Sequence, residues 1–222
     1  MTPAQTESFR KEGFLRLGAI AAEVELDLLR RLCDRALDKW RAGTMKFSSL
    51  SGKTPDSLVT VVSPEATEPE LKRTRLAETA RQAAAALYNC APDAILMGWR
   101  IFLKRPGADG TPWHQDAAYR PPPHIGASMF VPLDSVDSEV SCMRYSPGSH
   151  LFGLRPHVLE HGHFAAKDPD SGATALCPLR AGEAVIHHCL TLHATGPHEG
   201  ALARRAFAIV FQPQIGQSKE VV

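Results

Sequence analysis

Trp113-His114-Gln115-Asp116 places two side chains that bind metal ions readily, His114 and Asp116, two positions apart. In an extended segment, residues i and i+2 point to the same side, so both side chains can reach one ion. A histidine much later in the chain, His193, and then Arg204 complete the pattern. A fold in which distant strands lie face to face is needed to bring His193 to the same ion.

The segments around this stretch are short, β-branched or aromatic, and separated by glycine and proline, which is typical of strands. We expect strands over residues 95–104, 127–133, 142–145, 183–187 and 205–211. Most of the 17 prolines fall between these segments. The pattern predicts an α+β fold with a double-stranded β-helix core, which is also called a jelly roll and is cupin-like.

The first part of the chain is expected to be helical. Residues 22–40 repeat apolar side chains at every fourth position, as an amphipathic helix does: Val24, Leu28, Leu32, Ala36 and Trp40. A second helix is expected over 78–89 because alanine and leucine have high helix propensity, and a first strand over 14–17. Residues 44–70, rich in Ser, Thr and Pro, are expected to form a mobile loop or lid.

Length and composition favour one domain made of residues 1–222, with a helix-rich part (1–94) packed on one sheet of the core (95–212). The net charge is +1 and like charges are not clustered, so neither nucleic acid nor a membrane surface is an expected partner. Apolar runs fall short of the roughly 18 residues of a membrane span. Five scattered cysteines and an N-terminus without a signal peptide favour a reducing, cytoplasmic location.

Other histidines offer alternatives. A His-x-Asp triplet arises by chance in about one of two chains of this composition, so the pair alone does not define a metal site. His157, His161 and His163 could instead form a zinc cluster, although the surrounding polar residues suggest an exposed loop. His187 and His188 are adjacent, so only one of them faces the interior of a strand.

Three motifs occur in a fixed order: Trp-His-Gln-Asp at 113–116, Pro-Gly-Ser-His at 147–150, and His193 followed by a turn of small residues and Arg204. Together they resemble the phytanoyl-CoA dioxygenase family of iron(II)/2-oxoglutarate-dependent oxygenases. The resemblance covers roughly residues 8–212. Each motif is weak by itself, and their order carries the resemblance.

The resemblance implies that His114, Asp116 and His193 bind iron(II). It also implies that Arg204 pairs with the distal carboxylate of 2-oxoglutarate, with the hydroxyl of Thr195 beside it. A guanidinium group can hold a carboxylate through two charge-assisted hydrogen bonds. The alternative for Arg204 is a surface arginine next to Arg205.

Further residues are candidates for the co-substrate or substrate pocket. The resemblance places His188 near the co-substrate and Phe130 beside it, although Phe130 could equally belong to the core. Arg100 and Lys104 share one face of a strand, and either could hold an acidic co-substrate or substrate or lie at the rim. Trp113 and Tyr119 flank the metal-binding pair and could line a substrate pocket.

The implied reaction uses iron(II), 2-oxoglutarate and dioxygen, with ascorbate as the reductant in vitro, and releases succinate and carbon dioxide. Related halogenases lack the carboxylate ligand, so Asp116 favours hydroxylation, with desaturation or cyclisation open. The chain is short and has no Asn-Gly before residue 142. These two departures from the family indicate a small metabolite or biosynthetic intermediate as the substrate, rather than an acyl thioester. An active-site mouth completed by another subunit, in a homo- or hetero-oligomer, agrees with them too.

Two other classes of function remain open from the sequence. One is a cupin-like metal-dependent dioxygenase or isomerase that does not use 2-oxoglutarate. The other is a non-catalytic jelly-roll protein that binds or regulates a partner. Succinate release and the effect of replacing Arg204 separate the expected oxygenase from both.

Overall fold

The computed structural model describes residues 1–44, 48–51, 57–169 and 172–214. Its larger sheet is antiparallel and has seven strands, in the spatial order β1 (Phe14–Ala19), β10 (Glu183–His188), β5 (Ala127–Pro132), β12 (Arg204–Pro213), β4 (Ile95–Lys104), β3 (Leu58–Val62) and β2 (Ser48–Ser51). A smaller sheet contains β11 (His193–Thr195), β6 (Met143–Tyr145) and β9 (Ala175–Cys177), and a hairpin pairs β7 (His157–Glu160) with β8 (His163–Ala166).

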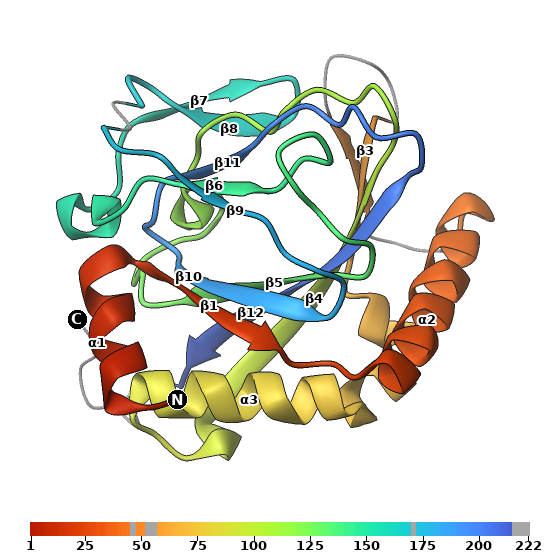
Figure 1. Ribbon diagram of the computed structural model, residues 1–222, viewed down its shortest axis with the longest axis horizontal. Coiled ribbons are helices and arrows are strands. Elements are labelled where there is room, and N and C mark those ends of the chain that lie inside the picture. Colours follow the sequence, from red (N-terminus) through yellow and green to blue (C-terminus); the bar gives the residue numbers. More distant parts are fainter. Residues whose placement is uncertain (45–47, 52–56, 170–171, 215–222) are drawn as a thin grey trace.

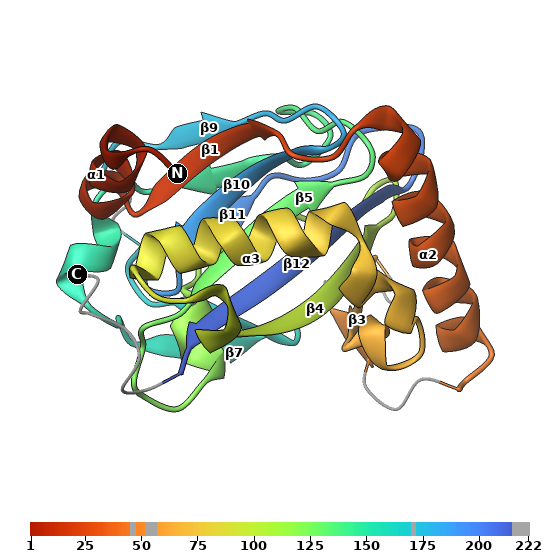
Figure 2. The ribbon, with the colours of Figure 1, turned by 90° about the horizontal axis from the view of Figure 1, so that it is seen from below.

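These elements form layers (Figure 1). The smaller sheet and the hairpin lie on one side of the larger sheet, and α3 (Arg75–Tyr88) crosses its other face. Figure 2 shows α2 (Glu23–Arg41) flanking the end of the sheet near β3, and α1 (Pro3–Glu12) at the opposite end. Short 3-10 helices occur at Pro64–Ala66, Pro69–Arg73, Pro92–Ala94, Asp116–Tyr119 and Ser149–Phe152.

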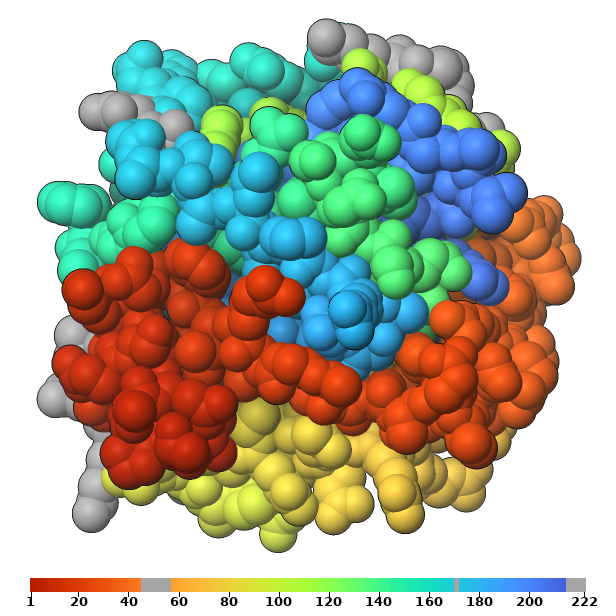
Figure 3. Space-filling view, in the orientation of Figure 1, coloured from red at the N-terminus to blue at the C-terminus, as the bar shows by residue number. Residues whose placement is uncertain are grey.

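The N-terminal segment closes one side of the molecule. In the space-filling view, the red residues of α1 and β1 run across the lower half, between light-blue residues above and the yellow residues of α3 below (Figure 3). Gly13, with φ of +79°, ends α1 and allows β1 to begin at once. Its lack of a side chain is required, because a Cβ here would lie 2.4 Å from the His150 ring. His150 therefore packs against the N-terminal segment, and its Nε2 donates a hydrogen bond to the Arg10 carbonyl.

The larger sheet separates two environments by the alternation of its side chains. On β4, Trp99, Ile101 and Leu103 belong to the apolar core shared with the helices. Arg100 and Lys104, on the opposite face of the same strand, line a cavity between the two sheets. The strand is thus apolar towards the helices and cationic towards the cavity.

Most predicted elements are confirmed, with boundaries within a few residues. The strand at 95–104 matches β4, and the helix at 22–40 matches α2 within one residue. The helix predicted at 78–89 begins earlier, at Arg75, because the Thr74 hydroxyl caps it by accepting a hydrogen bond from the Ala77 amide. Within the part of the chain that the structure describes, no helix is both long and apolar enough to cross a bilayer.

The prediction of a loop over residues 44–70 is wrong for much of its length. The β-branched run Leu58–Val62 forms β3, which pairs with β4 in the register Val61 to Ile101. Strand β2 and the 3-10 helix Pro64–Ala66 also fall in this interval, and a second 3-10 helix begins in it at Pro69. Residues 45–47 and 52–56 lie outside the described part. The first 94 residues therefore supply three strands of the larger sheet as well as helices.

Candidate active site

His114 and His193 face each other across an isolated antiparallel bridge. The His114 amide donates to the His193 carbonyl at 2.9 Å, and the His193 amide donates to the His114 carbonyl at 3.0 Å. Their ring centroids are 4.1 Å apart. Asp116, at the start of the 3-10 helix after this bridge, brings its carboxylate to the same place, so that one donor atom from each residue lies within 4.8 Å of the others.

Hydrogen bonds leave one atom of each side chain available to a metal ion. Nδ1 of His114 donates to the Pro112 carbonyl at 2.8 Å, and Nδ1 of His193 donates to the Thr191 carbonyl at 2.9 Å, so both Nε2 atoms keep their lone pairs. Oδ1 of Asp116 lies 3.6 Å from Nε2 of His193. A metal-binding histidine commonly has its other ring nitrogen fixed by such a carbonyl.

The protonation states suit a metal ion as well. Burial lowers the pKa of His114, and burial together with His114 and His187 holds the pKa of His193 well below its usual range. Burial by itself raises the pKa of Asp116, but the His187 hydrogen bond and the nearby histidines outweigh burial and hold this pKa well below normal. Two neutral imidazoles and one carboxylate form the donor set of non-heme iron(II) sites with open positions, so these residues fit that metal.

His187 and Ser128 orient Asp116. The Ser128 hydroxyl and Nε2 of His187 both donate to Oδ2 of Asp116, the latter at 3.3 Å. Because a carboxylate only accepts, Nε2 of His187 carries the proton, and Nδ1 accepts from the Tyr145 hydroxyl at 3.1 Å. This chain of contacts leaves Oδ1 of Asp116 as the oxygen that faces the histidines.

The structure does not support the placement predicted for His188 near the co-substrate, because this side chain does not line the cavity. On β10 the side chain that faces the cavity is His187, whereas Nδ1 of His188 accepts a hydrogen bond from the Leu190 amide and its ring lies beside His150. Alternation along the strand explains the difference, because Val185 and His187 share one face. The prediction used the sequence distance from His193 in the family, and this distance pointed to His188 although His187 is the residue that lines the cavity.

Two buried cations lie at the other end of the cavity, on neighbouring strands. Lys104 and Arg204 are paired in the register of β4 and β12, with exposed fractions of 1% and 3%. Nζ of Lys104 donates to the Ser141 hydroxyl at 2.7 Å, the Thr195 hydroxyl at 2.9 Å and the Gly196 carbonyl at 3.0 Å. Arg204 is thus buried, unlike a surface arginine, while its neighbour Arg205 pairs with Asp134.

Arg204 has unused hydrogen-bonding capacity. Its Nη2 donates to the Ser141 carbonyl at 3.0 Å, and its guanidinium carbon lies 5.2 Å from the centroid of the Phe130 ring. Its buried Nε has no partner among the described residues. Unpaired buried donors are rare in folded proteins, so this atom fits an anionic ligand such as the distal carboxylate of 2-oxoglutarate.

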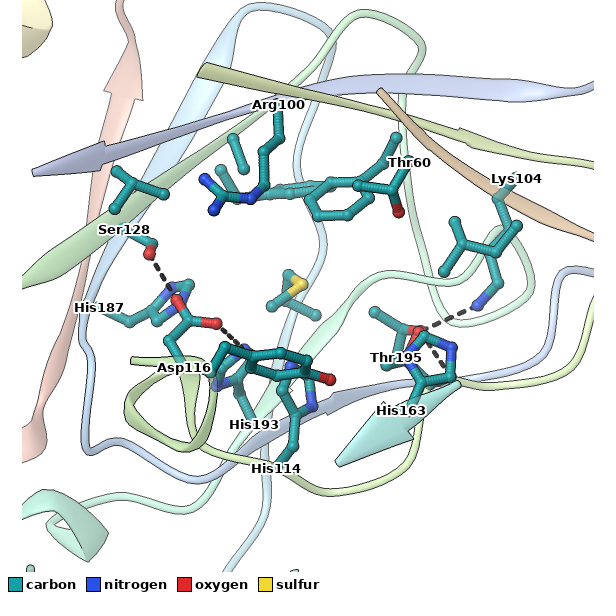
Figure 4. A pocket seen from close by; sticks show the side chains of 18 of the residues that line it. Thr60, Arg100, Lys104, His114, Asp116, Ser128, His163, His187, His193 and Thr195 are labelled. Carbon is teal, nitrogen blue, oxygen red and sulfur yellow. Dashed lines mark hydrogen bonds and ion pairs between the residues drawn. The ribbon is translucent and has the colours of Figure 1, made fainter. Parts of the chain in front are cut away.

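Both ends open into one cavity of about 400 Å³. Figure 4 shows Asp116, His114 and His193 on one side, Arg100 across from them, and Lys104 beside Thr195. Most of the site residues predicted from the sequence line this cavity: His114, Asp116, His193, Arg204, Thr195, Phe130, Arg100, Lys104 and Tyr119.

Trp113 and Gln115 are absent from the lining of this cavity, so the pocket role expected of Trp113 is not supported. The Trp113 carbonyl accepts a hydrogen bond from the Ala166 amide. Nε2 of Gln115 donates to the Gly153 and Leu190 carbonyls at 2.8 and 2.6 Å, and its Oε1 accepts from the Arg155 amide. Trp113 and Gln115 therefore hold the loop in place through hydrogen bonds to neighbouring segments of the chain.

The alternative zinc cluster does not form within the described part of the chain, where His114, Asp116 and His193 are the group close enough to hold a metal ion. His157 and His163 lie on the hairpin β7–β8, and His161 lies in its turn. Nε2 of His157 accepts a hydrogen bond from the Gln115 amide. His163 reaches the cavity, which the sequence did not indicate.

The geometry so far defines a class: a site for one metal ion with two histidines and one carboxylate, in a cavity whose far end is cationic. Residues 9–206 match the family described as phytanoyl-CoA dioxygenase (PhyH). The chain belongs to this family, and the resemblance drawn from the ordered motifs is confirmed. It is accordingly an enzyme of the iron(II)/2-oxoglutarate-dependent oxygenases.

Three relatives place the chain more closely. It is 27% identical over 218 residues to the methylphosphonate hydroxylase of Gimesia maris, covering 95% of this chain and 80% of that protein. It is 30% identical over 122 residues to a probable alpha-ketoglutarate-dependent hypophosphite dioxygenase of Stutzerimonas stutzeri, covering 50% of this chain and only 42% of that protein. The structure of EvdO2 from Micromonospora carbonacea var. aurantiaca, complexed with 2-oxoglutarate, superposes with a TM-score of 0.82 at 27% identity and covers 100% of this chain and 96% of that one.

Proposed function

We propose that the protein is a hydroxylase that uses iron(II), 2-oxoglutarate and dioxygen to oxidise an unactivated C–H bond of a small molecule, releasing succinate and carbon dioxide. The observation that carries the proposal is the cavity with His114, Asp116 and His193 at one end and the unpaired Nε of Arg204 at the other. Two facing antiparallel sheets support, as part of the same proposal, a double-stranded β-helix core.

Each group of residues has a task in this proposal. His114, Asp116 and His193 hold the iron, and Arg204 and Thr195 bind the distal carboxylate of 2-oxoglutarate, with Lys104 holding the Thr195 hydroxyl in place. Phe130 packs against the Arg204 guanidinium and keeps it directed into the cavity. Dioxygen is the oxidant, and bound iron(II) and 2-oxoglutarate would activate it, with 2-oxoglutarate supplying two electrons as it is converted to succinate and carbon dioxide. The chain supplies orientation and excludes water.

The size of the cavity and the nature of the relatives support a small substrate. A cavity of about 400 Å³ that also receives 2-oxoglutarate has little room for an acyl thioester. One relative is named for hydroxylating methylphosphonate, and this supports hydroxylation over desaturation or cyclisation. The carboxylate of Asp116 fills the third metal-binding position, in agreement with this choice.

Calorimetry tests the proposal directly. The protein is loaded with manganese(II) under nitrogen and titrated with 2-oxoglutarate, and succinate is then measured in air with iron(II) and ascorbate. We expect one 2-oxoglutarate per chain and succinate release that depends on it. Absence of 2-oxoglutarate binding would overturn the proposal and favour a metal enzyme without this co-substrate. Binding without succinate release under a broad panel of substrates would favour a non-catalytic protein.

A further inference from the structure

The charges that line the cavity do not balance. Four cationic side chains reach it, Arg100, Lys104, Arg120 and Arg204, against a single carboxylate in the described lining, that of Asp116. Iron(II) and the 2-oxoglutarate dianion cancel each other, so loading the site leaves this excess unchanged. A partly desolvated cavity with surplus positive charge favours an anionic occupant.

Lys104 and Arg204 account for one pair of these cations. They are direct neighbours across β4 and β12, and both contact Ser141. In the proposed function this pair receives the distal carboxylate of 2-oxoglutarate. Arg100 and Arg120 have no such task.

Arg100 is too far along β4 to share that carboxylate. It lies four residues before Lys104 on the same face and is paired with Ala208 rather than with Arg204. Four residues of strand span about 13 Å. Figure 4 shows the Arg100 guanidinium directed towards the end of the cavity where Ser128 and Asp116 lie, and away from Lys104 and Thr195.

The Arg100 guanidinium lacks a protein partner. No hydrogen bond or ion pair of this group occurs among the described residues, although burial lowers its pKa. The carboxylates of Asp116 and Glu65 act on it only from a distance, and Asp116 is already engaged by Ser128 and His187. A half-buried guanidinium that keeps all its donors free is placed to bind a ligand rather than to stabilise the fold.

Arg120 approaches the same end of the cavity from the loop after the 3-10 helix Asp116–Tyr119. Its positive charge is close enough to lower the pKa of Arg100 further, and its guanidinium also has no protein partner within the described part of the chain. Gly126 makes room for it, because a Cβ there would lie 2.8 Å from Nη1 of Arg120 and equally close to the Phe211 carbonyl. Arg120 thus brings a second positive charge to the end of the cavity where Arg100 lies, and neither guanidinium group forms an ion pair with a described residue.

We propose that Arg100 and Arg120 form a subsite for an oxyanion of the substrate, a phosphonate or a carboxylate, at the end of the cavity where Ser128 and Asp116 lie. The proposal rests on the proposed function and adds the chemical class of the substrate. The anionic group binds between the two guanidinium groups, which leaves the adjoining carbon atoms towards His114 and His193. The apolar side chains of Val62 and Val210 line the same cavity and suit a short hydrocarbon portion.

The test uses protein loaded with manganese(II) and 2-oxoglutarate under nitrogen, titrated with methylphosphonate, propionate and the neutral isostere propionamide. We expect at least one of the two anions to bind and propionamide not to bind at the same concentrations. The anion that binds more tightly distinguishes phosphonate from carboxylate recognition. Arg100→Met and Arg120→Met should each weaken anion binding about tenfold or more, since each removes a charge-assisted contact.

Controls separate the subsite from a structural or co-substrate role. Arg100→Lys keeps the charge without the planar donor pair and should lose less affinity than Arg100→Met. Arg105→Met changes an exposed arginine on the same segment and should bind the anion like the wild type. The 2-oxoglutarate affinity of Arg100→Met should stay within about twofold of wild type, with an unchanged unfolding midpoint.

Three results would overturn the inference. In the first, propionamide binds as well as both anions, or none of the three binds. In the second, Arg100→Met and Arg120→Met keep wild-type anion affinity. In the third, Arg100→Met weakens 2-oxoglutarate as much as it weakens the anion, which would make Arg100 part of the co-substrate site. If the wild type does not bind 2-oxoglutarate at all, the proposed function falls and the subsite with it.

Discussion

The two sides of the cavity are built in different ways. Around the metal-binding residues, neighbouring groups engage the polar atoms turned away from the candidate metal position: Nδ1 of both histidines and Oδ2 of Asp116. On the strands β4 and β12, by contrast, Nε of Arg204 and the Arg100 guanidinium have no partner among the described residues. On the metal side, the protein therefore fixes the orientation of each side chain and leaves one atom of each for a metal ion. On the cationic side, the two arginines keep donors for which the described residues supply no acceptor.

This contrast separates two kinds of mutational effect. A change on the metal side disturbs a network in which each residue fixes the next, so metal affinity and geometry should fail together. A change on the cationic side removes donors that the folded protein itself does not use, so ligand affinity should fall while the fold and the metal site remain. Substitutions on each side therefore measure how far metal affinity and ligand affinity can be separated.

Asp116→Ala should have the largest effect, because it removes the one charged ligand and the acceptor of both Ser128 and His187. We expect succinate formation to fall by about three orders of magnitude or more and metal affinity to fall with it. Titration with manganese(II), followed by an assay of succinate with iron(II), measures both. His161→Ala, in the exposed turn of the hairpin, is the matched control and should retain both properties. Wild-type metal affinity in Asp116→Ala would contradict the assigned metal site.

Arg204→Met should follow in size and should act on 2-oxoglutarate alone. Losing a buried, charge-assisted pair weakens 2-oxoglutarate binding by about a hundredfold, whereas manganese(II) affinity should stay within about twofold. Arg205 lies on the same strand, but its side chain forms ion pairs with Asp34 and Asp134 outside the cavity. The control variant Arg205→Met should therefore leave 2-oxoglutarate binding unchanged. Equal losses of metal and co-substrate affinity in Arg204→Met would show that the two sides are not independent.

His187→Phe tests whether the contacts around Asp116 matter as much as the metal-binding residues themselves. Without the Nε2 donor, the Asp116 carboxylate is held by Ser128 alone, and metal affinity should fall about tenfold. His188→Phe, one position along and outside the cavity, should keep the metal affinity of the wild type. The reverse order of effects would contradict the assignment of His187 as the histidine that orients Asp116.

The prediction that His114, Asp116 and His193 bind metal and that Arg204 binds the co-substrate came from the order of three motifs and the family resemblance that this order carries. The structure brings all four side chains to one cavity, although the His-x-Asp pair by itself did not define a site. The strand β4 was predictable for a different reason, since its alternation appears directly in the residues 95–104. Patterns of this kind involve only neighbouring residues, so they can be read from the sequence without knowledge of the tertiary structure.

Other features depend on contacts that sequence spacing does not encode. Ser128 orients Asp116 only because β5 and the ligand loop meet in space, and nothing in residues 127–133 marks this serine. The choice between His187 and His188 depends on which face of β10 is turned towards the cavity. Residues two apart share a face, so the apolar residue Val185 could have indicated that His187 points inward. Arg120 lies in a loop, where no period applies, so its place in the cavity was not predictable.

The smallest predicted effect concerns pH and depends on Lys104. Burial, followed by the positive charge of Arg204, lowers the pKa of Lys104 to about 7, while Asp109 opposes and Arg144 adds to the lowering. The 2-oxoglutarate carboxylate binds more tightly when Lys104 is charged. Below pH 7 the lysine is already protonated, so 2-oxoglutarate binds without proton uptake. Above pH 7 the lysine is neutral before binding and must gain a proton, so affinity falls as pH rises.

We expect 2-oxoglutarate affinity for the manganese(II)-loaded protein to fall about fivefold between pH 7 and pH 8.5, with proton uptake on binding at the higher pH. Calorimetry in two buffers of different ionisation enthalpy measures that uptake. Arg204 does not contribute, because its pKa, lowered by burial to about 10, leaves it charged across this range. Lys104→Met should bind more weakly and show neither the pH dependence nor the proton uptake. A wild-type affinity that is flat over this range would mean that Lys104 stays charged despite its burial, and that Ser141, Thr195 and Gly196 already compensate its charge.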